Sequence, residues 1–186
     1  MNIGFAMCGS LCTFAAVFPA MEAVAQEHTL IPILSQASAA IDSRFGPARE
    51  HIERVTKICG RPPLCTIEQV EPIGPKKLLD ALVIAPCTGN TLAKLAHSIA
   101  DGPVTMAAKS HLRNGRPILI AVSTNDALAG AAENIGKLLA RKNYFFVPFG
   151  QDDPNKKPTS MVADFARIPD ALAMALDGKQ IQPILL

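Results

Sequence analysis

Short runs of consecutive apolar residues alternate along this chain with longer segments in which apolar residues recur every three or four positions. The runs are typical of strands buried on both faces, and the recurring pattern is typical of helices that cover them. We expect strands at residues 2–7, 29–34, 82–85, 118–122 and 144–149. We expect helices at residues 14–26, 48–58, 88–101, 104–112 and 127–142, with short turns of helix near 66–69 and a last helix from Pro169.

This order of elements defines the expected fold class. Strands that alternate with helices form a parallel sheet with right-handed crossovers, so the chain is predicted to be an α/β protein. Its 186 residues fit one domain with a sizeable core, which we place at residues 1–186. Pro32 lies within the second strand and indicates an edge position or a strand terminus, because proline cannot donate to a neighbouring strand.

Short polar side chains follow four of the expected strands. They are Ser10, Ser35, Thr88 with Asn90, and Ser123 with Asn125. The carboxyl ends of parallel strands meet at one edge of the sheet, and ligands of open α/β sheets bind there. One polar strand end is explained by a helix cap, but four at one edge favour a binding site.

The first of these strand ends has the order strand, small polar turn and helix, which can direct backbone N–H groups at a phosphate. No G-x-G-x-x-G motif is present, and an ordinary capped helix explains the same residues equally well. Ser35 takes the place where a dinucleotide-binding fold carries an acidic residue. A mononucleotide therefore fits this pattern better than NAD.

Composition narrows the possible partners. Hydrophobic residues make up 49% of the chain and charged residues 18%, so we expect part of the surface to be buried in a homo-oligomer or against a partner. A net charge of +2, no Trp and one Tyr argue against nucleic acid and against an anionic membrane. The apolar run at 11–21 is broken by Pro19 and closed by Glu22, which argues against a membrane span or signal peptide and favours the cytoplasm. The five cysteines show no Cys-x-x-Cys pair, so we expect free thiols and no metal site.

The segment from Ala85 to Asp101 resembles the Pro-x-Ser/Thr-x-x-Thr-x-x-Lys-x-Ala-x-Gly-x-x-Asp stretch of the flavoprotein family that includes flavin-containing cysteine decarboxylases and flavin prenyltransferases. Further motifs are similar to the dipicolinate synthase B branch of that family. They are Arg-Phe-Gly at Arg44, Met-Ala-Ala-Lys at Met106, Ser-Thr-Asn-Asp-Ala-Leu at Ser123, Pro-Phe-Gly-Gln-Asp-Asp-Pro at Pro148, and Lys-Lys-Pro-x-Ser-Met-Val at Lys156. The resemblance spans nearly the whole chain.

This resemblance implies a three-layer, Rossmann-like fold with bound FMN. By position in the motifs, Ser35 is expected at the phosphate, and the other contacts are expected from three loops. The residues of these loops are Gly9, Ser10 and Thr13, then Pro86, Thr88, Asn90 and Thr91, then Ser123 and Asn125. Two departures stand out. Ser123-Thr124-Asn125 replaces most of the Pro-Ala-Met-Asn of the decarboxylases, and Ser-Thr-Asn-Asp stands where the prenyltransferases have Arg-Glu-Thr-Pro.

The B branch also implies a reaction. It is the oxidation of a dihydrodipicolinate-type precursor to dipicolinate (pyridine-2,6-dicarboxylate) in the mother cell of a sporulating bacterium. The expected partner is the A subunit of dipicolinate synthase, which is nicotinamide-dependent and would bind NADP. A dianionic substrate needs cations, and the candidates are Lys109, Arg113, Lys156 and Lys157, each of which is as easily a solvated surface charge.

Several interpretations stay open at this stage. A non-catalytic scaffold without flavin and an FMN-dependent decarboxylase or prenyltransferase are the alternative functions. No catalytic base is identified, and we expect His51 to be a solvated residue on a charged helical face. The loop at 151–158 is a lid, a docking surface or a plain connection, and the apolar tail at 181–186 is expected to pack on a neighbouring subunit.

Overall fold

A computed structural model describes all residues from 1 to 186, and its centre is a mostly parallel sheet. The strands are β1 (Asn2–Met7), β2 (Thr29–Leu34), β3 (Ala81–Cys87), β4 (Ile118–Thr124), β5 (Tyr144–Phe146), β6 (Phe149–Gly150) and β7 (Met161–Ala163). Their order is β2-β1-β3-β4-β7-β6, and β5 pairs with the first half of β4. The α/β prediction and the edge position of β2 are confirmed.

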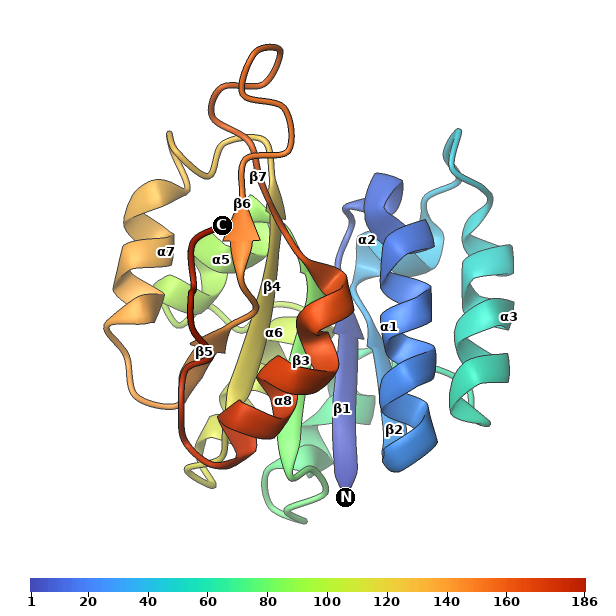
Figure 1. Ribbon diagram of the computed structural model, residues 1–186. Coiled ribbons are helices and arrows are strands. Elements are labelled where there is room, and N and C mark those ends of the chain that lie inside the picture. Colours follow the sequence, from blue (N-terminus) through green and yellow to red (C-terminus); the bar gives the residue numbers. More distant parts are fainter.

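Helices cover both faces of this sheet (Figure 1). They are α1 (Phe14–Glu27), α2 (Gln36–Ala40), α3 (Ala48–Cys59), α4 (Ile67–Val70), α5 (Gly89–Ala96), α6 (Pro103–Leu112), α7 (Ala132–Leu139) and α8 (Ile168–Leu176). Three short 3₁₀ turns are Leu11–Thr13, Glu71–Ile73 and Phe165–Arg167. In Figure 1, α1 and α8 lie in front of the sheet and α5 and α6 lie behind it, which gives three layers.

The core lies between these layers, because β1, β3 and β4 are buried along almost their whole length. Burial on both faces explains why their sequences are continuous apolar runs. The turns that follow these strands are therefore held at fixed positions along one edge of the sheet.

The fifth expected strand is divided. Tyr144–Phe146 runs parallel to β4, but Phe149–Gly150 pairs antiparallel with β7, which in turn pairs with Ser123 and Thr124. Pro148 separates the two pieces, and proline cannot supply a strand hydrogen bond. The loop 151–160 rises from β6 above the carboxyl edge (Figure 1).

Two expected helices are shorter than their patterns indicate. α5 ends at Ala96 instead of near Asp101, and Ile99, which lies beyond its end, is 48% exposed. α7 begins at Ala132 rather than Ala127, because residues 126–131 form turns. Asp126 O accepts the N–H groups of both Ala129 and Ala131, which explains why the turns replace the first helical residues.

One further expectation is corrected. His51 is buried instead of solvated, with its ring 5.0 Å from that of Phe14 and 6.2 Å from that of Phe18. The C-terminal tail is bonded to β6, because Phe149 N–H donates to Ile184 O and Leu186 N–H donates to Phe149 O. The side chains of Leu185 and Leu186 stay exposed, so the packing of the tail on a neighbouring subunit stays a prediction. In this structure no helix is long and apolar enough to cross a membrane.

Candidate functional site

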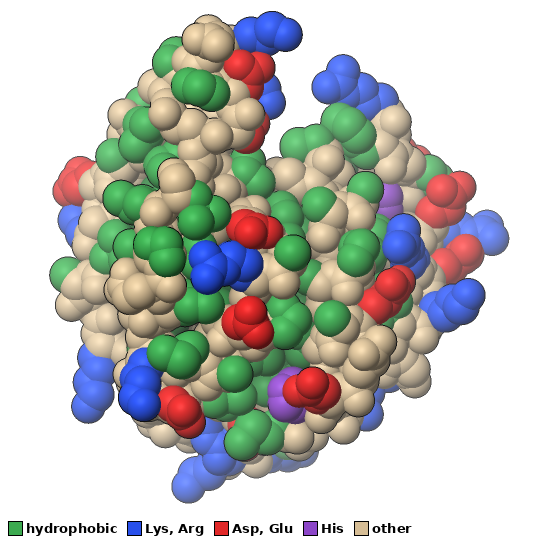
Figure 2. Space-filling view, in the orientation of Figure 1, with side chains coloured by type: hydrophobic (Ala, Val, Ile, Leu, Met, Phe, Trp, Pro, Cys, Tyr) green, Lys and Arg blue, Asp and Glu red, His purple; other side chains and the backbone are tan.

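Two adjoining cavities lie at the carboxyl ends of β1, β3 and β4. The first cavity, about 200 Å³, lies between Ser35, Thr88 and Thr105. The second cavity, about 670 Å³, lies between Ser10, Ser123 and the loop 151–160. Gly9 and Thr88 line both, so the cavities form one continuous recess. In the space-filling view the molecule is hollowed at the top, beside the loop 151–160 (Figure 2).

The first turn after β1 is fixed by hydroxyl groups. Ser10 Oγ lies 2.8 Å from the Oγ of Ser123, which lies near the end of β4. Thr13 Oγ1 donates to Ser10 O at 2.8 Å, which tightens the turn before α1. The strand ends of β1 and β4 thus meet directly, as the sequence predicted.

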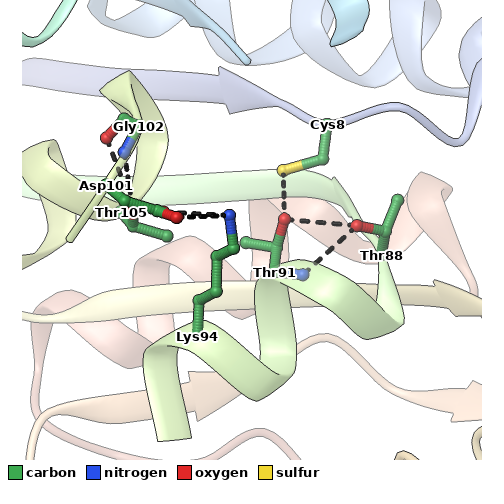
Figure 3. A network of polar contacts seen from close by, with 7 residues as sticks. All are labelled: Cys8, Thr88, Thr91, Lys94, Asp101, Gly102 and Thr105. Carbon is green, nitrogen blue, oxygen red and sulfur yellow. Dashed lines mark hydrogen bonds and ion pairs between the residues drawn. The ribbon is translucent and has the colours of Figure 1, made fainter. Parts of the chain in front are cut away.

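The start of α5 brings β1 and β3 together (Figure 3). Thr88 caps this helix by accepting the Thr91 N–H, and their hydroxyl oxygens are 3.2 Å apart. Thr91 Oγ1 donates to Cys8 Sγ at 3.3 Å. The cap leaves the first N–H groups of α5, at Gly89 and Asn90, without a partner inside the helix. Asn90 is exposed and also lines the first cavity.

Ser35 occupies the corresponding place after β2. Its Oγ accepts the Ser38 N–H at 3.2 Å and so caps α2. The Ser38 hydroxyl donates to Met7 O, which ties this turn to the end of β1. A Cβ on Gly9 would lie 3.2 Å from Ala37 Cβ, so glycine permits the close approach of the two turns.

The end of β4 is held from two sides. Thr159 Oγ1 donates to Asn125 O at 2.7 Å, and Ser160 Oγ donates to Asn125 Oδ1 at 3.3 Å. On the other side, a Cβ on Gly89 would lie 2.7 Å from Asp126 Oδ1 and 2.8 Å from Thr124 Oγ1. Asn125 is therefore positioned by the loop 151–160, and the 123–126 segment needs glycine at the start of α5.

Two ion pairs lie at this edge. Lys94 Nζ lies 2.9 Å from Asp101 in the wall of the first cavity, and the pair lowers the pKa of Asp101 (Figure 3). Lys157 Nζ lies 3.1 Å from Asp152 in the wall of the second. Burial opposes the charge on Asp152, but Ser160 and Lys157 outweigh it, so the pKa of this carboxyl is lowered.

Two cysteines at this edge are neutral thiols. Burial raises the pKa of Cys8 to about 11, although Thr91 and Thr88 oppose the shift. Burial, followed by the nearby Cys8, raises the pKa of Cys87 well above its usual range. Neither thiol supplies a thiolate near neutral pH.

The predicted site residues are brought together with four exceptions. Pro86 is buried in β3 and its carbonyl accepts the Cys8 N–H at 3.1 Å, so it supports the turn without lining either cavity. Lys109 and Arg113 lie in a separate cleft behind the sheet. Lys156 is exposed on the loop 151–160 and lines neither cavity. Thr13 does line the second cavity, and its hydroxyl is bonded to Ser10 O.

Several residues of the recess were not predicted. Cys8, Gln36, Lys94, Asp101 and Thr105 line the first cavity, and Asp152 lines the second. Cys8 directly follows β1, a signal that could have identified it. Nothing in the local pattern places Asp101 or Thr105 there, because Asp101 lies in the turn between α5 and α6 and Thr105 lies in the first turn of α6.

Comparison with known proteins places this geometry in a family. The family model described as Flavoprotein matches residues 2–170. The chain belongs to the flavoprotein family. It is 44% identical to the B subunit of dipicolinate synthase from Bacillus subtilis (strain 168) over 186 residues, which cover 100% of this chain and 93% of the relative.

Solved flavoprotein structures agree. The crystal structure of the B subunit of dipicolinate synthase from Bacillus halodurans C matches with a TM-score of 0.91 at 41% identity, over 100% of this chain and 95% of that one. The FMN-dependent cysteine decarboxylase SpaF matches with a TM-score of 0.71 at 22% identity, over 95% of each chain, and shares the fold.

The recess of this flavoprotein fits a flavin mononucleotide. Hydroxyls and first-turn N–H groups face the first cavity, and its one carboxylate, Asp101, is already paired with Lys94, so the donor set suits a phosphate. The larger second cavity adjoins it and has room for the rest of the nucleotide. Gly9 leaves the passage between them free of a side chain.

Proposed function

We propose that this chain acts as the B subunit of a dipicolinate synthase. In this role it takes part in oxidising a dihydrodipicolinate-type precursor to pyridine-2,6-dicarboxylate during sporulation. The observation that carries the proposal is the 44% identity to the B subunit of the Bacillus subtilis synthase over all 186 residues. An oxidoreductase subunit is the enzyme class that this reaction requires.

The proposed cofactor is FMN. Its phosphate would lie in the first cavity, against the hydroxyls of Ser35, Thr88 and Thr91 and the amide of Asn90. Its ribityl chain and ring would lie in the second cavity, near Ser10, Ser123 and Asn125. When bound, a flavin would supply an acceptor for a hydride, that is for two electrons and one proton, and the second proton that the aromatisation of a dihydropyridine releases would pass to water or to a base.

The chain's own residues would bind, orient and shield the substrate. Lys157 stands in the wall of the second cavity and is the cation of the loop 151–160 best placed to meet a carboxylate. Its partner Asp152 holds it there at 3.1 Å. Cys8 stays protonated near neutral pH and is excluded as the base. His51 lies under Phe14 and Phe18, away from both cavities.

The proposed partner is the A subunit of dipicolinate synthase, with NADP bound to that partner. Large apolar side chains exposed on this chain support association with a partner or with further copies of itself. They are Ile41, Phe45, Leu128, Leu139, Leu185 and Leu186. We propose a homo-oligomer that docks this nicotinamide-dependent partner.

The first experiment is a flavin titration of the purified chain, followed by absorbance and by quenching of FMN fluorescence. We expect saturable binding of one FMN per chain and release on heating. If the chain binds no FMN, the flavin-dependent function is contradicted and the non-catalytic scaffold function is supported.

The second experiment is a reconstitution. Dipicolinate formation is measured with this chain alone, with the nicotinamide-dependent partner alone and with both together, in the presence of NADP. We expect product above the rates of the separate proteins only with both. Equal rates with and without this chain would overturn the proposal. Turnover of a cysteinyl peptide or a prenyl phosphate by this chain alone would assign the decarboxylase or prenyltransferase function instead.

A further inference from the structure

A third hollow lies on the side of the molecule opposite α8, between the end of α5, α6 and the segment 141–144 that follows α7. Its volume is about 590 Å³, which is within the usual range for small-molecule sites. Apolar side chains form its walls, namely Leu95, Ile99, Ala100, Leu112 and Tyr144. Ile99 is one of these lining residues, and its side chain is 48% exposed. We call this hollow the basic cleft.

Four cations surround these apolar walls, and no acidic residue lines the basic cleft. The cations are Lys109, Arg113, Arg141 and Lys142. All four are exposed, and none of them is in an ion pair. The whole chain carries a net charge of only +2, so the positive charge is concentrated here. A concave site with apolar walls and charge of one sign attracts the opposite ion strongly.

Part of this positive charge is held rigidly. Arg141 donates to Leu95 O at 3.0 Å and to Ala96 O at 2.6 Å, which fixes its guanidinium against the end of α5. A guanidinium has five N–H donors, so others remain for a ligand. Lys109 and Arg113 stand four residues apart at the end of α6 and lie on one side of it. The cleft therefore offers cations from two separate elements across an apolar floor.

We infer that the basic cleft binds a small ligand with an apolar ring and two carboxylates. The ring would pack on Leu95, Leu112 and Tyr144, and the carboxylates would meet Arg113 and Arg141, whose planar guanidinium groups suit carboxylates. An inorganic anion would leave the apolar walls unused. The choice of pyridine-2,6-dicarboxylate as the representative of this class rests on the proposed function.

This site is separate from the flavin recess. Thr105 is the one residue that lines both the first cavity and the basic cleft, and its hydroxyl is bonded to the backbone of Gly102. A ligand in the cleft would therefore bind beside the cofactor and not in its place.

The test is calorimetric titration of pyridine-2,6-dicarboxylate into the full chain, with and without saturating FMN. We expect saturable binding in both cases. The double variant Lys109→Gln/Arg113→Gln is expected to weaken this binding about tenfold or more, because charge-assisted hydrogen bonds are lost. Pyridine-2-carboxylate, which lacks one carboxylate, is expected to bind more weakly than the dicarboxylate.

A matched control removes the same charge elsewhere. Lys57→Gln/Arg61→Gln changes two exposed cations at the end of α3 and is expected to bind both ligands like the parent chain. No binding to the parent chain, equal binding by the cleft variant, or displacement by FMN would each overturn the inference. So would binding only of an acidic peptide from the nicotinamide-dependent partner, which would make the cleft a docking surface.

The cleft and the proposed function fail in different ways. If the dicarboxylate binds but no dipicolinate forms in the reconstitution, the proposed function is contradicted and the ligand site in the basic cleft is supported. If dipicolinate forms but the cleft variant binds the dicarboxylate like the parent chain, the ligand site in the basic cleft is contradicted and the proposed function is supported.

Discussion

The strand-edge recess and the basic cleft use polar groups in opposite ways. At the recess, hydroxyls bond to one another across strands, as Ser10 does with Ser123, and the charges of Lys94 and Lys157 are paired with carboxylates. At the cleft, four cations are unpaired and surround apolar walls. The recess is thus suited to a ligand held by many short, directional contacts, and the cleft to one attracted by charge. The predictions below separate these two kinds of site.

The largest expected effect comes from Gly89→Val. The new side chain would collide with Asp126 and Thr124, which approach a Cβ at this position to below 3 Å. Relieving such overpacking typically costs about 1–3 kcal/mol and here requires the side chains of Asp126 and Thr124 to move. We expect FMN affinity to fall about tenfold or more in fluorescence titration, while dicarboxylate binding at the cleft is retained. Gly136→Val, where a Cβ meets nothing within 4 Å, is the control for the substitution itself.

The next effect is expected from Ser35→Ala. Ser35 caps α2 and faces the first cavity, so the variant should lose about 1 kcal/mol of stability and also bind FMN more weakly. Thr66→Ala removes a similar cap, at α4, far from the recess. Thermal unfolding should shift in both variants, but the flavin titration should change only for Ser35→Ala. Equal flavin affinity in the two variants would contradict the placement of the phosphate.

Cysteine labelling gives a milder test of the recess. Cys12 is exposed, whereas Cys8 and Cys87 are buried, and burial raises the pKa of Cys8 to about 11. A thiol-alkylating reagent near pH 8 should therefore label Cys12 first and leave Cys8 and Cys87 unlabelled until the chain unfolds, as read by mass spectrometry of peptides. Because Cys12 lines the second cavity, bound FMN should slow its labelling. Rapid labelling of Cys8 in the folded chain would contradict the burial of this thiol at the turn after β1.

The smallest effect is expected from Asp152→Asn. The pKa of Asp152 is lowered in the folded chain, so its contribution to stability is present above the unfolded value of about 4 and is lost as pH falls through the folded value. Its pair with the half-exposed Lys157 contributes at most about 1 kcal/mol. Chemical unfolding should show a small difference between parent and variant at pH 7 that shrinks as the pH falls below about 4. A difference that grows in acid would contradict the assignment.

The sequence predicted the parts of the fold that depend on local pattern. The order of strands and helices, and the small polar residues after each strand, could be read directly, because a strand buried on both faces must be apolar and must end in a turn. The meeting of Ser10, Thr88 and Ser123 followed from one rule, that parallel strands share a carboxyl edge.

What the sequence could not predict depends on packing between distant segments. His51 looked solvated because its helical neighbours are charged, but Phe14 and Phe18 of α1 cover it. Lys109 and Arg113 looked like candidates for the strand edge, but they lie where α6 ends, beside α5 and α7. The periodicity of apolar residues within one helix does not show which other element packs against each of its faces.

The bond between Ser10 and Ser123 joins positions 113 residues apart, so the recess cannot exist in any N-terminal fragment that stops before β4. Contacts of such long sequence separation form late, after the intervening chain has closed its loops. A growing polypeptide on the ribosome would therefore acquire cofactor only once two thirds of it had emerged. Flavin captured at that moment would favour the completed sheet over its partly folded precursors.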